Sequence, residues 1–206
     1  HPGTPRLFEN GQFLTPTGKA QLHGVTWRNE SEALSAAYPL VLTTGRIRDQ
    51  WHTMTRTGKS PRLGAHIDAP LVSGHPVDAE AFGVTDGGFA RIATLHGTAV
   101  LRVQATGAQR RGEIFAPIHW NGPTASDARV GALVQQACDP ISGQPELKAT
   151  QATIAPVAFA VHGFLLTRAA VAMPDGVWWG RSTLEGGAGY RLPPRRPRVP
   201  PPPNSR

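Results

Sequence analysis

The sequence predicts a mainly β fold with short helices, arranged as a small mixed barrel. Glycine (23) and proline (20) make up about a fifth of the 206 residues, against a usual share of roughly an eighth, which favours turns and short strands over a helical bundle. At least six short strand-like runs lie close together along the chain, with only two short helical segments among them. This pattern fits a mixed barrel better than a sandwich of regular hairpins or an alternating α/β sheet.

The strands can be placed one by one. The first 35 residues are rich in glycine and proline, and we expect only two short strands there, over 11–14 and 20–27. The first strong strand covers 38–43, where a continuous apolar run is centred on Val41, which predicts burial on both faces. Similar runs predict further strands over 70–73, 89–94, 98–106, 112–117 and 146–154.

Two segments predict short helices. In 75–83, proline stands at the first helical position, acidic residues follow in the first turn, and Gly83 stands at the end. In 126–136, Ser126 is a candidate N-cap with an acidic residue directly after it. We expect the core to centre on four strand segments and two side chains of the first helix, namely 38–42, 89–93, 100–103, 114–115, Val77 and Phe82.

Much of the positive charge gathers at the C-terminus. The net charge is +7, and five of these charges come from arginines within the last 16 residues. Residues 192–206 also hold seven prolines, which prevent a helix or a strand ladder, so we expect a disordered tail over 191–206. The rest of the chain is nearly neutral and does not predict specific nucleic-acid binding. A tail that serves as a ligand for nucleic acid or an SH3-type domain is the alternative.

Several classes of protein are excluded by what the sequence lacks. A single cysteine, Cys138, rules out a disulfide framework and a four-thiolate metal site. The eight histidines lack the spacing of a helical zinc site, so no metal site is expected. No nucleophile elbow, P-loop or dinucleotide fingerprint is present. No apolar run approaches the roughly 20 residues of a membrane span, so no membrane partner is expected. The chain begins with His1 rather than Met, and we expect a fragment or a processed product.

A long polar connection follows the first strong strand, over 44–69, and connections of this length are usually functional or disordered. It opens with Thr-Thr-Gly-Arg at 43–46 and continues with Trp-His-Thr-Met-Thr-Arg-Thr-Gly-Lys at 51–59. Glycine lets the backbone approach a phosphate, threonine hydroxyls donate hydrogen bonds, and arginine offers a planar fork. Trp51 can stack on a heterocycle. The alternative is an ordinary solvated basic loop with one buried tryptophan.

Two further segments are candidates for binding. His119, Trp120 and Asn121 follow the strand that ends at Pro117, and an aromatic with polar groups at a strand exit suits a flat heteroaromatic ligand. The alternative is a turn with a half-buried tryptophan and a histidine that contacts the backbone. The segment 139–148 is a tight loop rich in proline and glycine that ends in a lysine, and alone it predicts only a turn.

In order and spacing, these segments together resemble one known domain. It is the C-terminal, molybdopterin-guanine-dinucleotide-binding domain of assimilatory nitrate reductase catalytic subunits, a branch of the DMSO-reductase-type molybdenum oxidoreductase family. The His-Pro-x-Asp-Ala at 75–79 is shared by the wider superfamily, whereas the Trp-His-Thr-Met-Thr-Arg-Thr-Gly at 51–58 is narrower and points to nitrate reductases. The resemblance spans 3–190 and rests on the stretches 43–58, 75–83, 115–120 and 139–148.

This resemblance implies a double-psi β-barrel of the aspartate-decarboxylase-like class and a Mo-bis(molybdopterin guanine dinucleotide) cofactor. An iron–sulfur cluster is expected only in parts of the full-length protein outside this chain. No catalytic or metal-ligating residue is expected within it. The cofactor-binding residues that the resemblance implies are Thr43, Thr44, Gly45, Arg46, Trp51, His52, Thr53, Thr55, Arg56, His119, Trp120 and Lys148.

The resemblance also implies an organisation and a function. We expect a lead-in over 1–36, the binding barrel over 37–156, an extension over 157–190 and the tail over 191–206. The full-length protein is expected to reduce nitrate to nitrite in the cytoplasm, with the remainder of the catalytic chain and an electron-donor protein or subunit as partners, while this chain alone is inactive. The alternatives are the same domain in another molybdenum enzyme, such as a formate dehydrogenase, or a non-catalytic stand-alone binding barrel.

Two features depart from the family pattern. Gly131 stands where related periplasmic enzymes have a polar residue that contacts the cofactor, so this contact is not carried over. After Tyr190 the chain becomes rich in arginine and proline, where family members continue with recognisable sequence.

Overall fold

The computed structural model describes residues 3–24, 26 and 33–193, and the chain divides into a small unit, His1–Glu30, and a large unit, Ser31–Arg206. In the small unit the described residues form turns, in which the rings of Phe8 and Phe13 stack with centroids 4.8 Å apart. Residues 194–206 of the predicted disordered tail lie outside the described part of the chain.

The two strands predicted over 11–14 and 20–27 are wrong, since none of the described residues in these ranges is in a strand. Gly11 and Gly18 take positive φ angles of 72° and 68° and turn the chain back on itself. Leu14 and Leu22 are 97% and 95% exposed. A strand here would gain little, because Leu14 and Leu22 are not buried against any other element.

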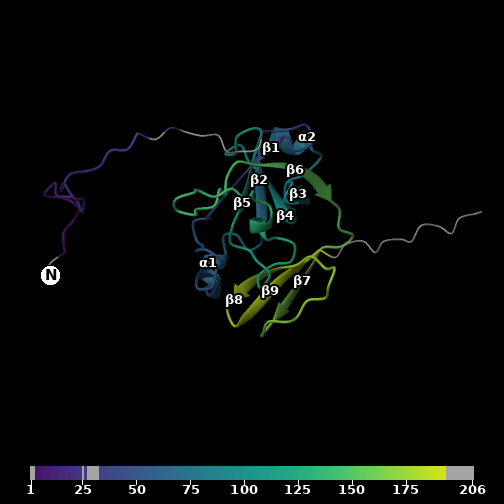
Figure 1. The fold of residues 1–206 in the computed structure, drawn as a ribbon. Helices are drawn as coiled ribbons and strands as arrows, with labels where there is room; N and C mark the ends of the chain where they lie inside the picture. Colours follow the sequence, from purple (N-terminus) through teal and green to yellow (C-terminus); the bar gives the residue numbers. More distant parts are fainter. Residues whose placement is uncertain (1–2, 25, 27–32, 194–206) are drawn as a thin grey trace, which may run out of the picture. The chain divides into compact units, whose positions relative to one another are not determined.

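Six strands of the large unit close into a barrel (Figure 1). Around the barrel the order is β1-β5-β2-β4-β3-β6. β1 pairs in parallel with β5, β2 pairs in parallel with β4, and the other pairs are antiparallel. The mainly β fold with short helices and a closed mixed barrel is thus confirmed. The strands are β1 (Leu40–Gly45), β2 (Leu71–Gly74), β3 (Phe89–Ala93), β4 (Thr98–Ala105), β5 (Glu113–Pro117) and β6 (Thr150–Val157).

The burial of β1 differs from the prediction that both its faces are covered. Leu40, Leu42 and Thr44 are at most 3% exposed, whereas the residues between them, including Val41, are only partly buried. Alternate residues of a barrel strand face the interior and the exterior, so a continuous apolar run does not guarantee two buried faces. The barrel interior is filled by side chains such as Ile92 and Leu101, neither of which is exposed.

The helix predicted over 75–83 is α2 (Pro76–Ala81). The Nδ1 atom of its N-cap, His75, accepts a hydrogen bond from the amide of Val77 at 3.2 Å. Val77 is 43% exposed, so its predicted place in the core is wrong. The inward face instead carries Ala79 and the carboxylate of Asp78, which accepts from the amide of Gly112 at 2.6 Å and so holds the helix against the start of β5.

The helix predicted over 126–136 is also wrong, since only a single 3-10 turn forms there, η2 (Val130–Ala132). Asp127 has a φ of 47°, which no right-handed helix tolerates. The Ser126 hydroxyl does not cap a helix, because it accepts from the amide of Trp179 at 2.8 Å and donates to the carbonyl of Val177 at 3.3 Å.

A second sheet has the strand order β7-β9-β8 and consists of β7 (Gly163–Thr167), β8 (Gly180–Leu184) and β9 (Gly187–Leu192). The two bonds of Ser126 join it to the segment just before β8. Arg191 and Leu192, which the prediction assigns to the disordered tail, therefore belong to a strand. Trp178 fixes this small sheet to the barrel: its indole Nε1 donates to the carbonyl of Val100 at 2.8 Å, and the side chain is 1% exposed. Phe89 packs against the same ring.

Candidate functional site

The exit of β1 is held to the segment before β6 by hydrogen bonds. The buried Thr44 hydroxyl donates to the carbonyl of Leu147 at 2.6 Å, and the ammonium of Lys148 donates to the carbonyl of Thr44. These contacts bring together predicted site residues that lie about a hundred positions apart. They also explain why β6 begins at Thr150 rather than at 146: the preceding residues wrap around Thr44, and Ala149 has a positive φ of 57°.

Gly45 lies close to an aromatic ring on the neighbouring strand. A Cβ atom at this position would lie 3.1 Å from the ring carbon Cε2 of Phe115. The missing side chain thus makes room for this ring, and the predicted approach of a ligand to Gly45 stays a prediction. The carbonyl of Gly45 accepts from the amide of Ile118 at 3.0 Å, which continues the contact between β1 and β5 past the strand ends.

The side chain of Arg46 lies over the indole of Trp51, with its guanidinium carbon 4.3 Å from the ring centroid. Such a contact stabilises an exposed pair by about 0.5–1 kcal/mol. Trp51 is 55% exposed, so the alternative of a basic loop with one buried tryptophan does not describe this segment. A large aromatic face and a fixed cation are therefore presented together on the surface of the unit.

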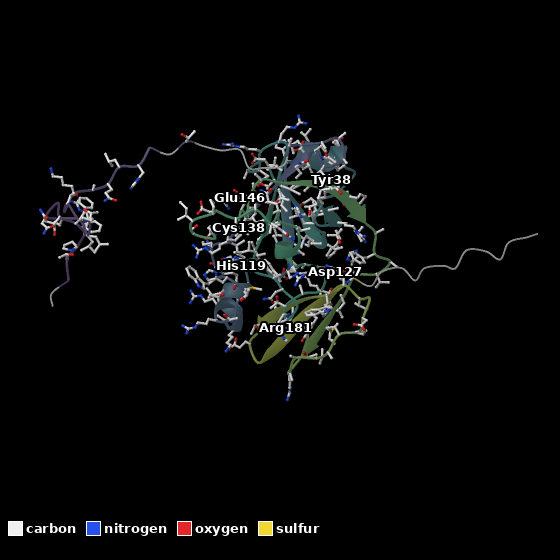
Figure 2. All side chains as sticks on the ribbon, viewed as in Figure 1. Tyr38, His119, Asp127, Cys138, Glu146 and Arg181 are labelled. Carbon is white, nitrogen blue, oxygen red and sulfur yellow. The ribbon has the colours of Figure 1, made fainter. Side chains whose placement is uncertain are left out.

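His119, which is labelled in Figure 2, follows the end of β5 and is hydrogen-bonded to both sides of this loop. The amide of Ile47 donates to Nε2 at 3.0 Å, so the Nδ1 atom carries the proton and donates to the carbonyl of His52 at 2.5 Å. The ring is fully buried, and this burial lowers the pKa of His119, with Arg46 adding a smaller effect in the same direction. His119 is thus a neutral imidazole that fixes both limbs of the loop.

The backbone between these anchors turns twice through the left-handed region. His52 and Met54 have φ angles of 44° and 61°, which cost energy for residues other than glycine. The Met54 side chain is only 8% exposed and anchors the turn. A Cβ at Gly58 would lie 2.9 Å from the Met54 Cβ, so the glycine is needed for this close approach. The strain is held by surrounding contacts, a pattern that is frequent at binding sites.

Several polar side chains of the loop remain exposed with their donors unused. In the described ranges, Thr53, Thr55 and Arg56 make no side-chain hydrogen bond or ion pair. The structure thus divides the predicted site residues into two groups. Thr44, His119 and Trp120 are buried, whereas Arg46, Trp51, His52, Thr53, Thr55, Arg56 and Lys148 are exposed, with Thr43 and Gly45 between these extremes.

The segment 139–145 forms the tight loop that its composition predicts. The carboxylate of Asp139 accepts from the amide of Ser142 at 2.7 Å and from that of Ile141 at 3.1 Å. The hydrogen bonds from Ser142, more than that from Ile141, lower the pKa of Asp139. Gly143 completes the turn with a φ of 70°. After this loop, the carboxylate of Glu146 accepts from the amide of Lys148 at 2.8 Å.

Two features of the structure, an ion-paired group and a hollow, were not predicted from the sequence. Arg48, Asp49 and His66 form an ion-paired group, in which Arg48 Nε lies 3.0 Å and His66 Nδ1 2.8 Å from the Asp49 carboxylate. The hydrogen bond from Arg48, more than any other contact, lowers the pKa of Asp49. An open hollow of about 450 Å³ lies elsewhere, lined by Thr98, Gly122, Ala125, Ser126, Asp127, Ala128, Arg129, Ala132 and Trp179. No motif marks it, because it depends on the contact between two distant segments.

Among residues 3–24, 26 and 33–193, no three histidine, cysteine or acidic side chains gather in a way that holds a metal ion. Over the same ranges, no helix has the length and apolar character needed to cross a membrane.

Comparison with known proteins gives a consistent picture. The family described as "Molydopterin dinucleotide binding domain" matches residues 40–151. A nitrate reductase of Klebsiella oxytoca is 41% identical, over 82% of this chain and 20% of that protein. The assimilatory nitrate reductase catalytic subunit of Bacillus subtilis is 33% identical, over 76% and 22%. An F420-dependent formate dehydrogenase 1 subunit alpha of Methanococcus maripaludis is 30% identical, over 74% and 22%. This chain spans about a fifth of the length of these relatives.

Proposed function

Because the chain belongs to the molybdopterin dinucleotide-binding domain family, we propose that the exposed side of segment 43–56 binds a molybdopterin guanine dinucleotide of a bis(dinucleotide) molybdenum cofactor. The full-length protein reduces nitrate to nitrite, and its relatives that are 41% and 33% identical are nitrate reductases. When bound, the cofactor supplies the oxygen-atom transfer chemistry at molybdenum. The residues of this chain bind and orient it.

The observation that carries this proposal is the Arg46–Trp51 pair on an exposed loop with unused donors. A pterin dinucleotide presents fused rings, which favour stacking, and a pyrophosphate, which favours N–H, hydroxyl and arginine donors. Trp51 offers the stacking face. Arg46, Arg56 and the hydroxyls of Thr53 and Thr55 offer the donors. The residues present therefore fit the group that the family name implies.

The buried members of the predicted set take a different part in this proposal. Thr44 and His119 have hydrogen-bonding groups that are engaged inside the fold. Trp120 is 3% exposed and belongs to the barrel core. We assign these residues to holding the loop in shape, while Gly45 contributes its backbone. The predicted side-chain contacts of Thr43, His52 and Lys148 with the cofactor belong to the proposal as well.

The test is an Arg46→Ala variant of the full-length protein. Loss of a charge-assisted hydrogen bond costs about 1.5–3 kcal/mol, or about ten- to a hundredfold in binding. Molybdenum and guanine nucleotide per protein should therefore fall strongly, while the Michaelis constant for nitrate of the loaded fraction stays unchanged. Arg46→Lys should restore binding only in part, because a point charge lacks the planar fork.

Arg91 provides a matched control, since it is an exposed arginine on β3, outside the loop. Arg91→Ala should retain the cofactor at the level of the unaltered protein. Full occupancy in Arg46→Ala with a raised Michaelis constant would move Arg46 to the substrate channel. Full occupancy with unchanged kinetics would remove the loop from the cofactor site altogether.

A second candidate is formate oxidation, favoured by the formate dehydrogenase relative that is 30% identical. The two candidates share the cofactor site and differ in substrate, so assays of the full-length protein with nitrate and with formate separate them. In both cases the remainder of the catalytic chain and an electron donor are the partners. A cytoplasmic location and the lack of activity of this chain alone are further parts of the proposal.

A further inference from the structure

The small sheet reaches the candidate binding loop from its inner side. The hydroxyl of Thr183, on β8, donates to the carbonyl of Gly58 at 2.5 Å. Gly58 belongs to η1 (Thr57–Lys59), and both η1 and the following α1 (Pro61–Gly64) lie against β8. A second contact joins the two parts further along, where Arg191 Nε on β9 lies 2.9 Å from the Asp68 carboxylate.

A short chain of hydrogen bonds continues from Gly58 to the exposed aromatic. The amide of Gly58 donates to the carbonyl of Met54 at 2.9 Å, and the amide of Met54 donates to the carbonyl of Trp51 at 2.9 Å. The amide of Trp51 in turn donates to the hydroxyl of Thr57 at 3.1 Å. The position of Trp51 is therefore fixed by a chain of hydrogen bonds that ends on β8.

β8 itself is held firmly by the barrel. The amide of Arg181 donates to the carbonyl of Thr124 at 2.8 Å, and the buried Trp178 lies just before the strand. In Figure 2, Arg181 lies on the small sheet below His119. A rigid strand whose anchors lie outside the loop can hold the loop in one conformation even where its backbone is strained.

The space between β8 and the loop is too small to be a ligand pocket. A cavity of about 30 Å³ lies there, lined by residues that include Gln50, Met54, Gly58, Arg181 and Thr183. Sites for ligands of this class have volumes on the order of 300 Å³ or more. The contact between β8 and the loop is therefore a structural joint, and any dinucleotide lies on the other, exposed side.

We propose that Thr183 is a positioning residue, which holds the 51–58 loop in the conformation that binds the pterin dinucleotide. The inference rests on the proposed function and extends it to a strand outside the matched range 40–151. It predicts that the small sheet contributes to cofactor retention without touching the cofactor. The hydroxyl is the group that matters, since it makes the bond to Gly58.

The test compares three variants of the full-length protein. Thr183→Val removes the hydroxyl and keeps the shape, whereas Thr183→Ser keeps the hydroxyl. Thr167→Val is the matched control, because the Thr167 hydroxyl on β7 is buried and has no hydrogen-bond partner among the described residues. The measurements are amide hydrogen exchange in 51–58 and the rate at which the purified protein loses molybdenum and guanine nucleotide.

We expect Thr183→Val to exchange these amides faster and to lose the cofactor about two- to tenfold faster, the range that one net hydrogen bond supports. Thr183→Ser and Thr167→Val should match the unaltered protein. Unchanged exchange in Thr183→Val would overturn the inference, and so would faster exchange without faster cofactor loss. If the unaltered protein carries no pterin dinucleotide, the proposed function itself fails, and the inference fails with it.

Discussion

On the inner side of segment 44–58, the Thr44 hydroxyl and both ring nitrogens of His119 are buried and hydrogen-bonded. On the outer side, Arg46 lies over the face of an exposed Trp51, and among the described residues the side-chain donors of Arg56 have no partner. Thr44 and Arg46 even belong to the same short motif. The difference teaches that one motif can contain residues whose polar groups are engaged inside the fold and residues whose donors stay exposed. The two kinds should respond differently to substitution.

The largest expected effect on stability is on the inner side. His119→Leu removes the acceptor for the Ile47 amide and the donor for the His52 carbonyl, which are two part-buried hydrogen bonds. The net loss of one hydrogen bond costs about 0.5–1.5 kcal/mol, so the free energy of unfolding should fall by about 1–3 kcal/mol. Trp51→Ala, on the outer side, should change it by no more than about 1 kcal/mol, the contribution of its contact with Arg46. Urea unfolding measures both variants, and equal losses would erase the distinction between the two sides.

A matched pair of threonines sharpens the comparison at smaller magnitude. Thr44→Val leaves the carbonyl of Leu147 without its donor, and the free energy of unfolding should fall by about 1–2 kcal/mol. Thr55→Val removes an exposed hydroxyl that bonds to nothing in the described part of the chain, so its effect on stability should lie within about 0.5 kcal/mol. A larger loss for Thr55 than for Thr44 would reverse the assignment of sides.

The sequence predicts the barrel strands well because their apolar runs are local signals. It fails where long-range contacts decide the structure. The 126–136 segment has a capping serine, yet Ser126 bonds to Val177 and Trp179, more than fifty residues away. β7, β8 and β9 were not predicted, and in β9 the glycine-rich run from Gly187 to Gly189 carries a weak strand signal.

The candidate site shows the same division between local and distant information. Motif spacing identifies segment 43–58 and the His119-Trp120 pair as candidates for binding, and the resemblance predicts that their ligand is a pterin dinucleotide. Neither shows that His119 is buried against the backbone of Ile47 and His52, because this contact joins residues about seventy positions apart. Thr183 carries no motif at all, and only its bond to Gly58 reveals it.

The smallest effect expected on the inner side is a dependence on pH. Burial lowers the pKa of His119 below its ordinary value of 6.5, so the unfolded chain binds this proton more readily than the folded one. Stability should therefore be complete above pH 6.5 and fall as the pH drops from there toward the lowered pKa. The slope contributed by one such group is at most about 1.4 kcal/mol per pH unit. Unfolding of the unaltered chain and of His119→Gln between pH 7.5 and 5.5 measures this contribution, and identical slopes would contradict it.

The central claim, that the outer side of the loop meets the cofactor, is tested most directly by hydroxyl-radical oxidation of the full-length protein with and without its cofactor. Trp51 is 55% exposed and Met54 is 8% exposed, so one loop carries both the probe and its internal control. The account predicts that Trp51 is oxidised readily in the cofactor-free protein and is protected in the loaded protein, while Met54 reacts slowly in both. Equal oxidation of Trp51 in the two forms would contradict it.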